Sequence, residues 1–282
     1  MMISPRTDHL IDLALEEDAG LGDLTSEAIF SAHDRARGII VAKQALTLCG
    51  IGIATRVFKK VDPKLTVTPL AADGDRLKNG QLVLRISGPT TALLTAERTA
   101  LNFLQKLSGI ATLAQKFAEA IAGTGVRIVD TRKTTPGWRA LEKYAVRCGG
   151  CWNHRSSLGE HVLIKDNHIA AAGSLARAVA RARAAAPHLA KIEVEAKTSA
   201  EVTAALRAAA DVILLDNMTP AMIQRAIARI AGAAVVEVSG GVRFETLRDY
   251  ALPGVDVISV GALTHSATAV DLSLEVSPIR KR

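Results

Sequence analysis

Basic side chains gather just after two apolar, strand-like runs in the middle of the chain. The runs are 126–129 and 162–164, and the basic residues that follow them are Arg132, Lys133, His154, Arg155 and Lys165. Arginine makes planar, bidentate contacts with carboxylates and phosphates, whereas lysine contributes a compact positive charge. Catalytic residues of parallel α/β folds lie at the carboxyl ends of strands. The spacing therefore predicts a pocket for a small, densely anionic substrate rather than a solvated basic surface.

The C-terminal half of the chain alternates short apolar segments with alanine-rich amphipathic segments. Such alternation predicts a parallel sheet with helices between its strands, either open or closed into a barrel. The predicted strands are 126–131, 162–165, 191–195, 212–216, 235–239 and 256–260. The predicted helices between them are 175–186, 200–209, 220–230 and 246–251. About six such units are fewer than the eight of a complete TIM barrel.

Each predicted strand has an apolar interior and ends at a polar residue or a glycine. In a barrel these ends surround one opening. Glu195 and Asp216 would there bind sugar hydroxyls, or a Mg²⁺ ion that carries pyrophosphate. The Ser-Gly-Gly turn at 239–241 offers backbone N–H groups to a phosphate. A structural alternative for Glu195 is simple pairing with Lys165 or Lys197 on the same rim.

The N-terminal half has a different pattern. Residues 1–20 predict an amphipathic helix, and 36–89 predict short strands and turns, with strands at 38–42, 65–69 and 82–86. Leucines at helical spacing predict that 91–123 is helical, in two helices separated at Gly109. This segment is expected to join a small domain to a larger one.

Composition narrows the classes of protein that remain. The chain has 282 residues, 49% of them hydrophobic, which is enough to bury a full core. The net charge is +7, but aromatic residues are 3% and the only dense basic tract is Arg280-Lys281-Arg282, so we expect no nucleic-acid partner. No apolar run is long enough to span a membrane. Three cysteines cannot form a full disulfide framework, which is typical of a reducing compartment, so we expect a cytoplasmic protein. We expect Cys148 and Cys151 to be two packed thiols.

Several longer motifs resemble those of quinolinate phosphoribosyltransferase. They are Asp130-Thr131-Arg132-Lys133-Thr134-Thr135-Pro136-Gly137, Arg139-Ala140-Leu141-Glu142-Lys143-Tyr144-Ala145-Val146, Asn153-His154-Arg155 and Lys165-Asp166-Asn167-His168. Shorter matches extend the likeness, in order, from Glu17-Asp18 to Ser266. The resemblance implies an α/β fold: an N-terminal α/β sandwich domain (1–110) and a C-terminal incomplete (open) α/β barrel of the seven-stranded type (111–266). A tail (267–282) would pack back on the N-terminal domain.

The resemblance also implies an activity and a set of site residues. The reaction would be phosphoribosyl transfer from phosphoribosyl pyrophosphate (PRPP) to quinolinate with decarboxylation, in NAD biosynthesis, with Mg²⁺ as cofactor. The implied catalytic residues are Lys133, Glu195 and Asp216, and the last two would also hold the Mg²⁺. The implied substrate-binding residues are Arg98, Arg132, His154, Arg155, Lys165, Ser239, Gly240, Gly241 and Gly261. Arg98 would reach into the neighbouring subunit's site, which implies a homodimer, and dimers that assemble further are compatible with it.

Three alternatives stay open at this point. The molybdenum-associated paralogue has the same fold, but the complete cation set and Lys165-Asp166-Asn167-His168 argue against it. A nicotinate phosphoribosyltransferase would need to recognise only one carboxylate. A non-catalytic anion-binding or carrier module is suggested by a hammerhead-like segment near 74–84, but it gives no reason for acids at strand ends. The chain departs from the family pattern at Trp152, Ser157 and Lys197.

Overall fold

The computed structural model describes residues 3–279, and contacts between residues divide them into two compact units. Unit 1 takes 3–115, 135–150 and 267–279, and unit 2 takes 116–134 and 151–266. The sequence assigned 135–150 to the barrel, whereas Trp138 in this segment stacks on Phe103 with ring centroids 4.8 Å apart. Tyr144 likewise donates a 2.8 Å hydrogen bond to Asp73, so the segment groups with unit 1. The basic residues 280–282 lie outside the described range.

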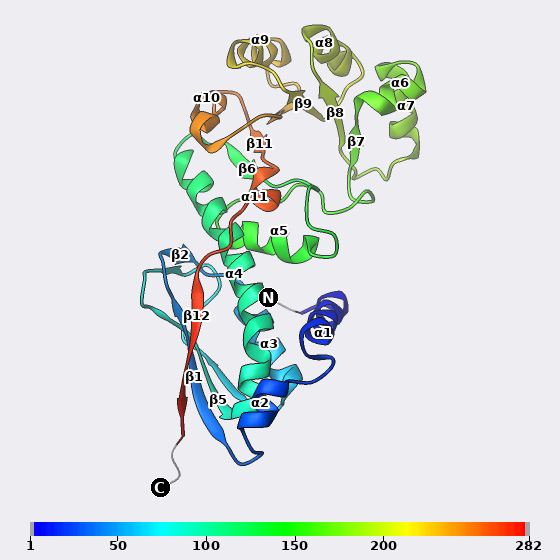
Figure 1. Ribbon diagram of the computed structural model, residues 1–282. Coiled ribbons are helices and arrows are strands. Elements are labelled where there is room, and N and C mark those ends of the chain that lie inside the picture. The colour runs from blue at the N-terminus through cyan, green and yellow to red at the C-terminus, as the bar shows by residue number, and fades with distance from the viewer. Residues whose placement is uncertain (1–2, 280–282) are drawn as a thin grey trace. The chain divides into compact units, whose positions relative to one another are not determined.

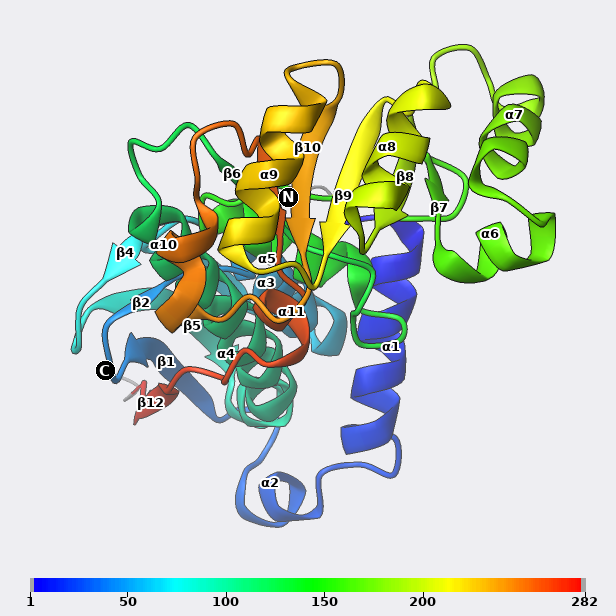
Figure 2. The same ribbon diagram turned by 90° about the horizontal axis from the view of Figure 1, so that it is seen from above.

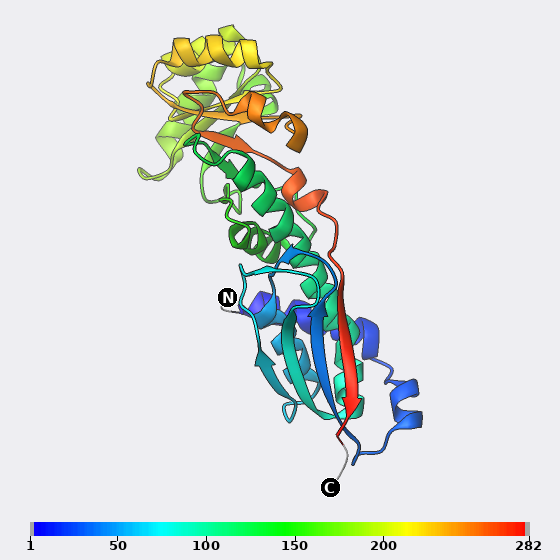
Figure 3. The ribbon, with the colours of Figure 1, turned by 90° about the vertical axis from the view of Figure 1, so that its left-hand side faces the viewer.

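Unit 1 is built on a four-stranded antiparallel sheet in the order β12-β1-β5-β3 (Figure 3). Its strands are β1 (Arg35–Ala42), β3 (Thr66–Pro69), β5 (Leu82–Pro89) and β12 (Leu272–Pro278). The short strands β2 (Leu46–Thr47) and β4 (Arg76–Leu77) pair separately. Buried and exposed residues alternate along the first part of β1, which is typical of a sheet with one covered face. The three strands predicted between 36 and 89 are confirmed.

The helices of unit 1 include one that the sequence interpretation missed. They are α1 (Pro5–Ala19), α2 (Leu24–Ile29), α3 (Ile51–Val61), α5 (Arg139–Cys148) and most of α4 (Thr90–Ala120). Helix α3 interrupts the 36–89 segment, for which only strands and turns were predicted. Its buried residues follow helical spacing, but its first N–H groups are capped from a distance. Asp73 accepts hydrogen bonds from Gly50 N and Ile51 N at 2.8 and 2.9 Å, so local capping signals are lacking.

Helix α4 is a single helix through Gly109, and the prediction of two helices is wrong. A Cβ atom at residue 109 would lie 2.1 Å from the Thr268 carbonyl oxygen. Glycine is therefore present because another part of unit 1 passes directly over the helix, and not because the helix ends there.

Unit 2 contains a six-stranded parallel sheet in the order β6-β11-β10-β9-β8-β7 (Figures 1 and 2). Its strands are β6 (Arg127–Val129), β7 (Val162–Ile164), β8 (Ile192–Ala196), β9 (Val212–Asp216), β10 (Val235–Ser239) and β11 (Val257–Ser259). All six predicted strands are confirmed, and the barrel is open because β6 and β7 are the two edges. Beside β6, a single parallel bridge between Val129 and Trp152 stands where a seventh strand was expected.

Helices connect the strands of unit 2 and cover the outer face of the sheet. They are α6 (Asp166–Ala172), α7 (Leu175–Ala185), α8 (Ser199–Arg207), α9 (Pro220–Ile230), α10 (Leu247–Tyr250) and α11 (Ala262–His265), with a 3₁₀ turn at Phe244–Thr246. The side chains of Ser174, Thr198 and Thr219 cap α7, α8 and α9, which fixes where each helix begins. The four helices predicted in this half are confirmed. Within residues 3–279, no helix combines the length and apolar character that crossing a membrane requires.

Replacing Gly109 with alanine tests whether this residue permits a close approach or breaks the helix. Alanine would improve the helix propensity by about 1 kcal/mol, but its Cβ would overlap the Thr268 carbonyl. We expect Gly109→Ala to lower the free energy of unfolding by about 2 kcal/mol or more, measured by urea denaturation. Asn102→Ala, at an exposed position of the same helix, is the control and should be neutral or stabilising. A stabilised Gly109→Ala protein would contradict the packing role.

Candidate functional site

The carboxyl ends of the unit 2 strands surround a pocket of about 600 Å³, here called the strand-end pocket. It brings together most of the predicted site residues: Arg132, Lys133, His154, Arg155, Lys165, Glu195, Asp216, Ser239, Gly240 and Gly241. Their convergence follows from parallel pairing, because adjacent parallel strands end at the same edge of a sheet. Gly261 lies beside the pocket, where an added Cβ would be 3.0 Å from the Lys133 side chain.

Arg98 is the predicted site residue that belongs to unit 1. It lies on α4 in unit 1 and is exposed. There it lines a separate cavity of about 350 Å³ together with Asp18 and Asp23 of the same unit.

Rim carboxylates of the pocket are already engaged with lysines. Glu195 lies 3.2 Å from Lys165 Nζ and 3.6 Å from Lys197 Nζ, and its side chain is 9% exposed. Lys197 also pairs with Asp166 at 2.9 Å, and the bond to Asp166 raises the pKa of Lys197. The pairing considered as a structural alternative for Glu195 is therefore present. It leaves Glu195 between two cations on the rim, where a bound anion would also lie.

The turn after β10 requires glycine at positions 240 and 241, because a side chain there would be strained or would overlap a neighbour. Gly240 has a φ of +87°, and an added Cβ would lie 2.4 Å from the side-chain oxygen of Asn217. Gly241 also has a positive φ, of +64°. Asn217 follows β9 and donates from its backbone N to the Ser239 carbonyl at 2.9 Å. The turn is thus held against the end of β9, and its backbone is accessible from the pocket.

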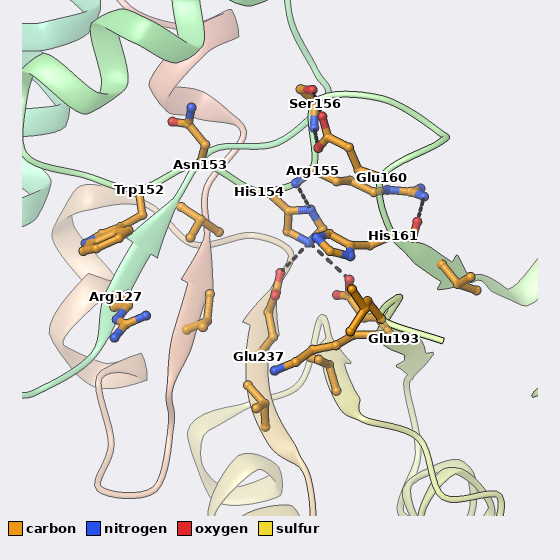
Figure 4. A pocket seen from close by; sticks show the side chains of 17 residues that line it. Arg127, Trp152, Asn153, His154, Arg155, Ser156, Glu160, His161, Glu193 and Glu237 are labelled. Carbon is orange, nitrogen blue, oxygen red and sulfur yellow. Dashed lines mark hydrogen bonds and ion pairs between the residues drawn. The ribbon is translucent and has the colours of Figure 1, made fainter. Parts of the chain in front are cut away.

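Buried acids lie inside the barrel behind the cationic rim, which corrects the expectation of apolar strand interiors. Glu193 on β8 and Glu237 on β10 are 6% and 4% exposed. His154 Nε2 lies 3.2 Å from Glu193 Oε2 and 3.5 Å from Glu237 Oε1. Figure 4 marks both contacts with dashed lines. Each acid is two residues before a predicted site residue on its strand, Glu195 or Ser239, and so shares its face. That alternation was the signal that could have identified both.

The two acids determine the electrostatics of His154. Burial on its own would lower the pKa of His154, but the hydrogen bonds to Glu193 and Glu237 raise it to about 10. Nδ1 accepts a 2.8 Å hydrogen bond from the Arg155 N–H, which the doubly protonated ring has to give up. Two buried carboxylates outweigh one neutral hydrogen bond, so they favour the charged ring. Burial also raises the pKa of Glu193.

Arg155 and Arg132 are the guanidinium groups of the pocket. Arg155 is 9% exposed, and one of its nitrogens donates to the His161 carbonyl at 2.8 Å. Burial, and then the neighbouring charge of Arg132, lower the pKa of Arg155. Arg132 Nε is buried and makes no hydrogen bond with the described residues. Two close, partly desolvated cations of this kind favour binding of an anionic group between them.

A second cavity, of about 700 Å³, opens at the other end of the strands and is here called the rear cavity (Figure 4). The first residues of β6, β7, β9, β10 and β11 line it, which places it at the amino ends of the strands. Trp152 also lines it, under the guanidinium of Arg127 at 4.9 Å. His154, Arg155 and Glu237 line both the rear cavity and the strand-end pocket.

The groups of possible metal ligands differ in whether they could hold a metal ion. Glu195 and Asp216 offer carboxylate oxygens beside the pocket, which is the ligand type that Mg²⁺ takes. His154 Nε2 points a hydrogen at the buried acids, so it has no lone pair for a metal ion there.

In unit 1, Cys148 lies close to Cys49 and Asp73, and the Cys49 thiol lowers the pKa of Cys148. Cys49 is thus a thiol neighbour of Cys148 in unit 1.

His168 has a structural position. Its Nδ1 accepts a 2.9 Å hydrogen bond from the Lys165 backbone N and so closes the first turn of α6.

Comparison with known proteins identifies the class and then the family. The family model for the C-terminal domain of quinolinate phosphoribosyl transferase matches residues 110–275, and that for its N-terminal domain matches 23–108. The chain is therefore a phosphoribosyltransferase. It belongs to the quinolinate phosphoribosyltransferase family.

Individual relatives agree with this assignment. The chain is 43% identical over 262 residues to a probable nicotinate-nucleotide pyrophosphorylase [carboxylating] of Bacillus subtilis, covering 93% of this chain and 90% of the relative. It is 42% identical to the Mycobacterium leprae nicotinate-nucleotide pyrophosphorylase [carboxylating], covering 93% and 94%. The solved structure of NadC from Streptococcus pyogenes superposes with a TM-score of 0.95 at 42% identity, covering 99% of this chain and 100% of that one.

The pH dependence of stability tests the His154 cluster. Because the folded-state pKa is raised from 6.5 to about 10, its stabilisation is complete below pH 6.5 and is lost as the pH rises through 10. We expect His154→Gln to lower the free energy of unfolding by about 3 kcal/mol at pH 6. Between pH 6 and pH 10.5 this difference should shrink, as measured by urea denaturation at each pH.

The exposed His188 offers the control for that measurement. His188→Gln should differ little from the parent protein at any pH in the series. A loss for His154→Gln that stays constant from pH 6 to 10.5 would show that the buried acids do not hold the ring charged.

Proposed function

We propose that the strand-end pocket binds quinolinate and PRPP and converts them to nicotinate mononucleotide, pyrophosphate and CO₂, a step of NAD biosynthesis. The observation that carries the proposal is the gathering of Arg132, Arg155 and Lys165 around one pocket that Glu195 and Asp216 also line. Relatives named quinolinate phosphoribosyltransferase [decarboxylating] in tobacco, 38% identical over 289 residues, support the same reaction.

Quinolinate carries two adjacent carboxylates, and the cationic side of the pocket suits both. Arg132 and Arg155 would clamp one carboxylate, since the buried Arg132 Nε still lacks an acceptor. Lys165 would neutralise the other from the end of β7. His154 would contribute its positive charge to the same side of the pocket, because its Nε2 is directed to the buried acids.

PRPP would occupy the other side of the pocket. The turn at 239–241 would bind its 5′-phosphate through backbone N–H groups. Glu195 and Asp216 would bind the ribose hydroxyls and hold Mg²⁺, which when bound neutralises the pyrophosphate leaving group. Lys133 would add a positive charge beside that pyrophosphate.

The charges match the course of the transfer. When the bond from the ribose to pyrophosphate breaks, positive charge grows on the ribose ring and negative charge on the leaving group. Lys133 would stabilise the leaving group, and the carboxylates of Glu195 and Asp216 would stabilise the ribose. Because these groups are fixed before the reaction begins, they lower the barrier without reorganising in the transition state. No covalent nucleophile is needed.

Assembly is part of the proposal. Arg98 is an exposed residue of α4 in unit 1, and the family motif assigns it to substrate binding in the neighbouring subunit. We infer a homodimer in which Arg98 of one subunit completes the site of the other.

We also infer a cytoplasmic location, which three cysteines without a disulfide framework favour.

A carrier or plain anion-binding module fits the molecule less well. Such a module would not require Glu195 and Asp216 beside a cationic pocket. Trp152, where the chain departs from the family pattern, lines the rear cavity and so gives no reason to expect a different acceptor.

Two arginine substitutions test the site and its sharing in one experiment. Arg132→Ala removes a bidentate contact and should lower kcat/KM for quinolinate by roughly 10²–10³-fold. Arg98→Ala should also lose most activity. If sites are shared, random mixing makes half of the dimers mixed, each with one intact site of two, so about one quarter of the activity returns.

Turnover should be followed as pyrophosphate release, with subunit exchange shown separately by mass spectrometry of labelled protein. Arg207→Ala, in the last turn of α8, is the control and should retain full activity. Normal turnover by Arg132→Ala would overturn the site assignment. Absence of rescue despite demonstrated exchange would overturn the shared site.

A further inference from the structure

Two cysteine thiols from different parts of unit 1 lie side by side. Cys49 comes directly before the N-cap of α3, and Cys148 is the last residue of α5 (Figure 1). Their sulfur atoms and a carboxylate oxygen of Asp73 all lie within 4.8 Å of one another. The reaction proposed for the strand-end pocket uses none of these three groups, so the pair needs a separate explanation.

Asp73 links the two helices at this point. Its Oδ1 atom accepts the hydrogen bonds from the N–H groups at the start of α3, and its Oδ2 atom accepts the 2.8 Å hydrogen bond from Tyr144. Tyr144 is four residues before Cys148 on α5 and therefore lies on the same face of that helix. The carboxylate thus holds the start of α3 against the last turn of α5, which keeps the two sulfur atoms close.

The backbone of Cys49 is fixed from α4. Ser108 of that helix is fully buried, and its Oγ atom accepts a 2.9 Å hydrogen bond from Cys49 N. The same hydroxyl donates to the Cys49 carbonyl at 3.1 Å. Because both backbone groups of Cys49 are engaged, its thiol keeps its place beside Cys148.

The two thiols differ in their access to solvent and in their reactivity. Cys49 is 0% exposed, whereas Cys148 is half-buried. The hydrogen bond between the thiols lowers the pKa of Cys148 and raises that of Cys49, although burial and the Asp73 charge oppose the change at Cys148. A dissolved oxidant therefore meets Cys148 first, and Cys148 is the better nucleophile because the thiolate is the reactive form. Oxidation-sensitive cysteines combine such access with a second thiol next to them.

A metal ion fits the same groups less well. Among the described residues this cluster offers three ligand groups, whereas structural zinc sites have four. Both oxygens of Asp73 already accept hydrogen bonds, with which a metal ion would compete. A bond between the two sulfur atoms needs neither a fourth ligand nor Asp73.

We propose that hydrogen peroxide oxidises Cys148 and that Cys49 then closes a reversible disulfide with it. In the first step, the Cys148 thiolate attacks one oxygen of the peroxide, the O–O bond breaks, and a sulfenic acid and hydroxide form. In the second, the Cys49 sulfur attacks the Cys148 sulfur, the S–O bond breaks, and the oxygen leaves as water. The two thiols together lose two electrons and two protons, and the peroxide is reduced to two molecules of water.

This chemistry is independent of the reaction proposed for the strand-end pocket. In a reducing compartment, cellular thiols would return both cysteines to the thiol form, so the disulfide would last only while peroxide is present. Closing the disulfide also protects Cys148, because a sulfenic acid without a partner thiol is oxidised further and irreversibly.

The test uses the reduced, folded parent protein. After exposure to hydrogen peroxide, the peroxide is removed with catalase, and the protein is unfolded in an alkylating agent and mapped by mass spectrometry. We expect the free thiols to fall from three to one, with an intact mass lower by about 2 Da before alkylation and a peptide pair joined through Cys49 and Cys148. Dithiothreitol should restore all three thiols.

Two serine substitutions separate the roles of the thiols. Cys151→Ser removes the third thiol and should leave the bond between Cys49 and Cys148 unchanged. Cys49→Ser removes the partner thiol, so Cys148 should be oxidised to sulfinic acid, with a gain of about 32 Da that dithiothreitol does not reverse. Because the main measurement is made on the parent protein, the proposal stays testable if Cys49→Ser does not fold.

Three results would overturn the proposal. One is retention of all three thiols at an exposure that oxidises most of the free glutathione in the same solution. Another is a disulfide between Cys148 and Cys151 in place of the expected bond. The third is sulfinic acid at Cys148 of the parent protein while Cys49 stays reduced.

Discussion

Parallel pairing of six short strands is the constraint on which the site depends. Because the strands run in one direction, every strand delivers its last residues to one edge, and charges that are distant in sequence converge there. The cost is that several of these charges are partly desolvated. Opposed groups offset that cost: Glu195 lies between two lysines, and His154 lies between two buried acids. The same pairs keep the cationic groups in place before a substrate arrives.

The barrel interior also separates two openings with different character. The strand-end pocket holds the groups suited to anions and sugar hydroxyls, whereas the rear cavity begins among the first, mainly apolar residues of the strands. His154, Arg155 and Glu237 line both. The buried cluster is thus the wall between the openings, and its ionised groups contribute both to stability and to the chemistry proposed for the pocket.

Much of this could be predicted from sequence, because the parallel sheet leaves strong local signals. All six strands of unit 2 were placed within two residues at either end, and their polar ends identified the pocket. The errors came from contacts distant in sequence. Helix α3 is capped by Asp73, Gly109 is required by Thr268, and residues 135–150 pack on unit 1. Glu193 and Glu237 were missed because their strands were interpreted as apolar, although their alternation with Glu195 and Ser239 was visible.

The central claim is that the cations at the strand ends select an acceptor with two adjacent carboxylates. The most direct test supplies the purified protein with PRPP, Mg²⁺ and either quinolinate or nicotinate, and follows mononucleotide and CO₂. The account predicts nicotinate mononucleotide and CO₂ from quinolinate, with little or no product from nicotinate, which lacks one carboxylate. Turnover of nicotinate at a comparable rate, or of neither acceptor, would contradict it.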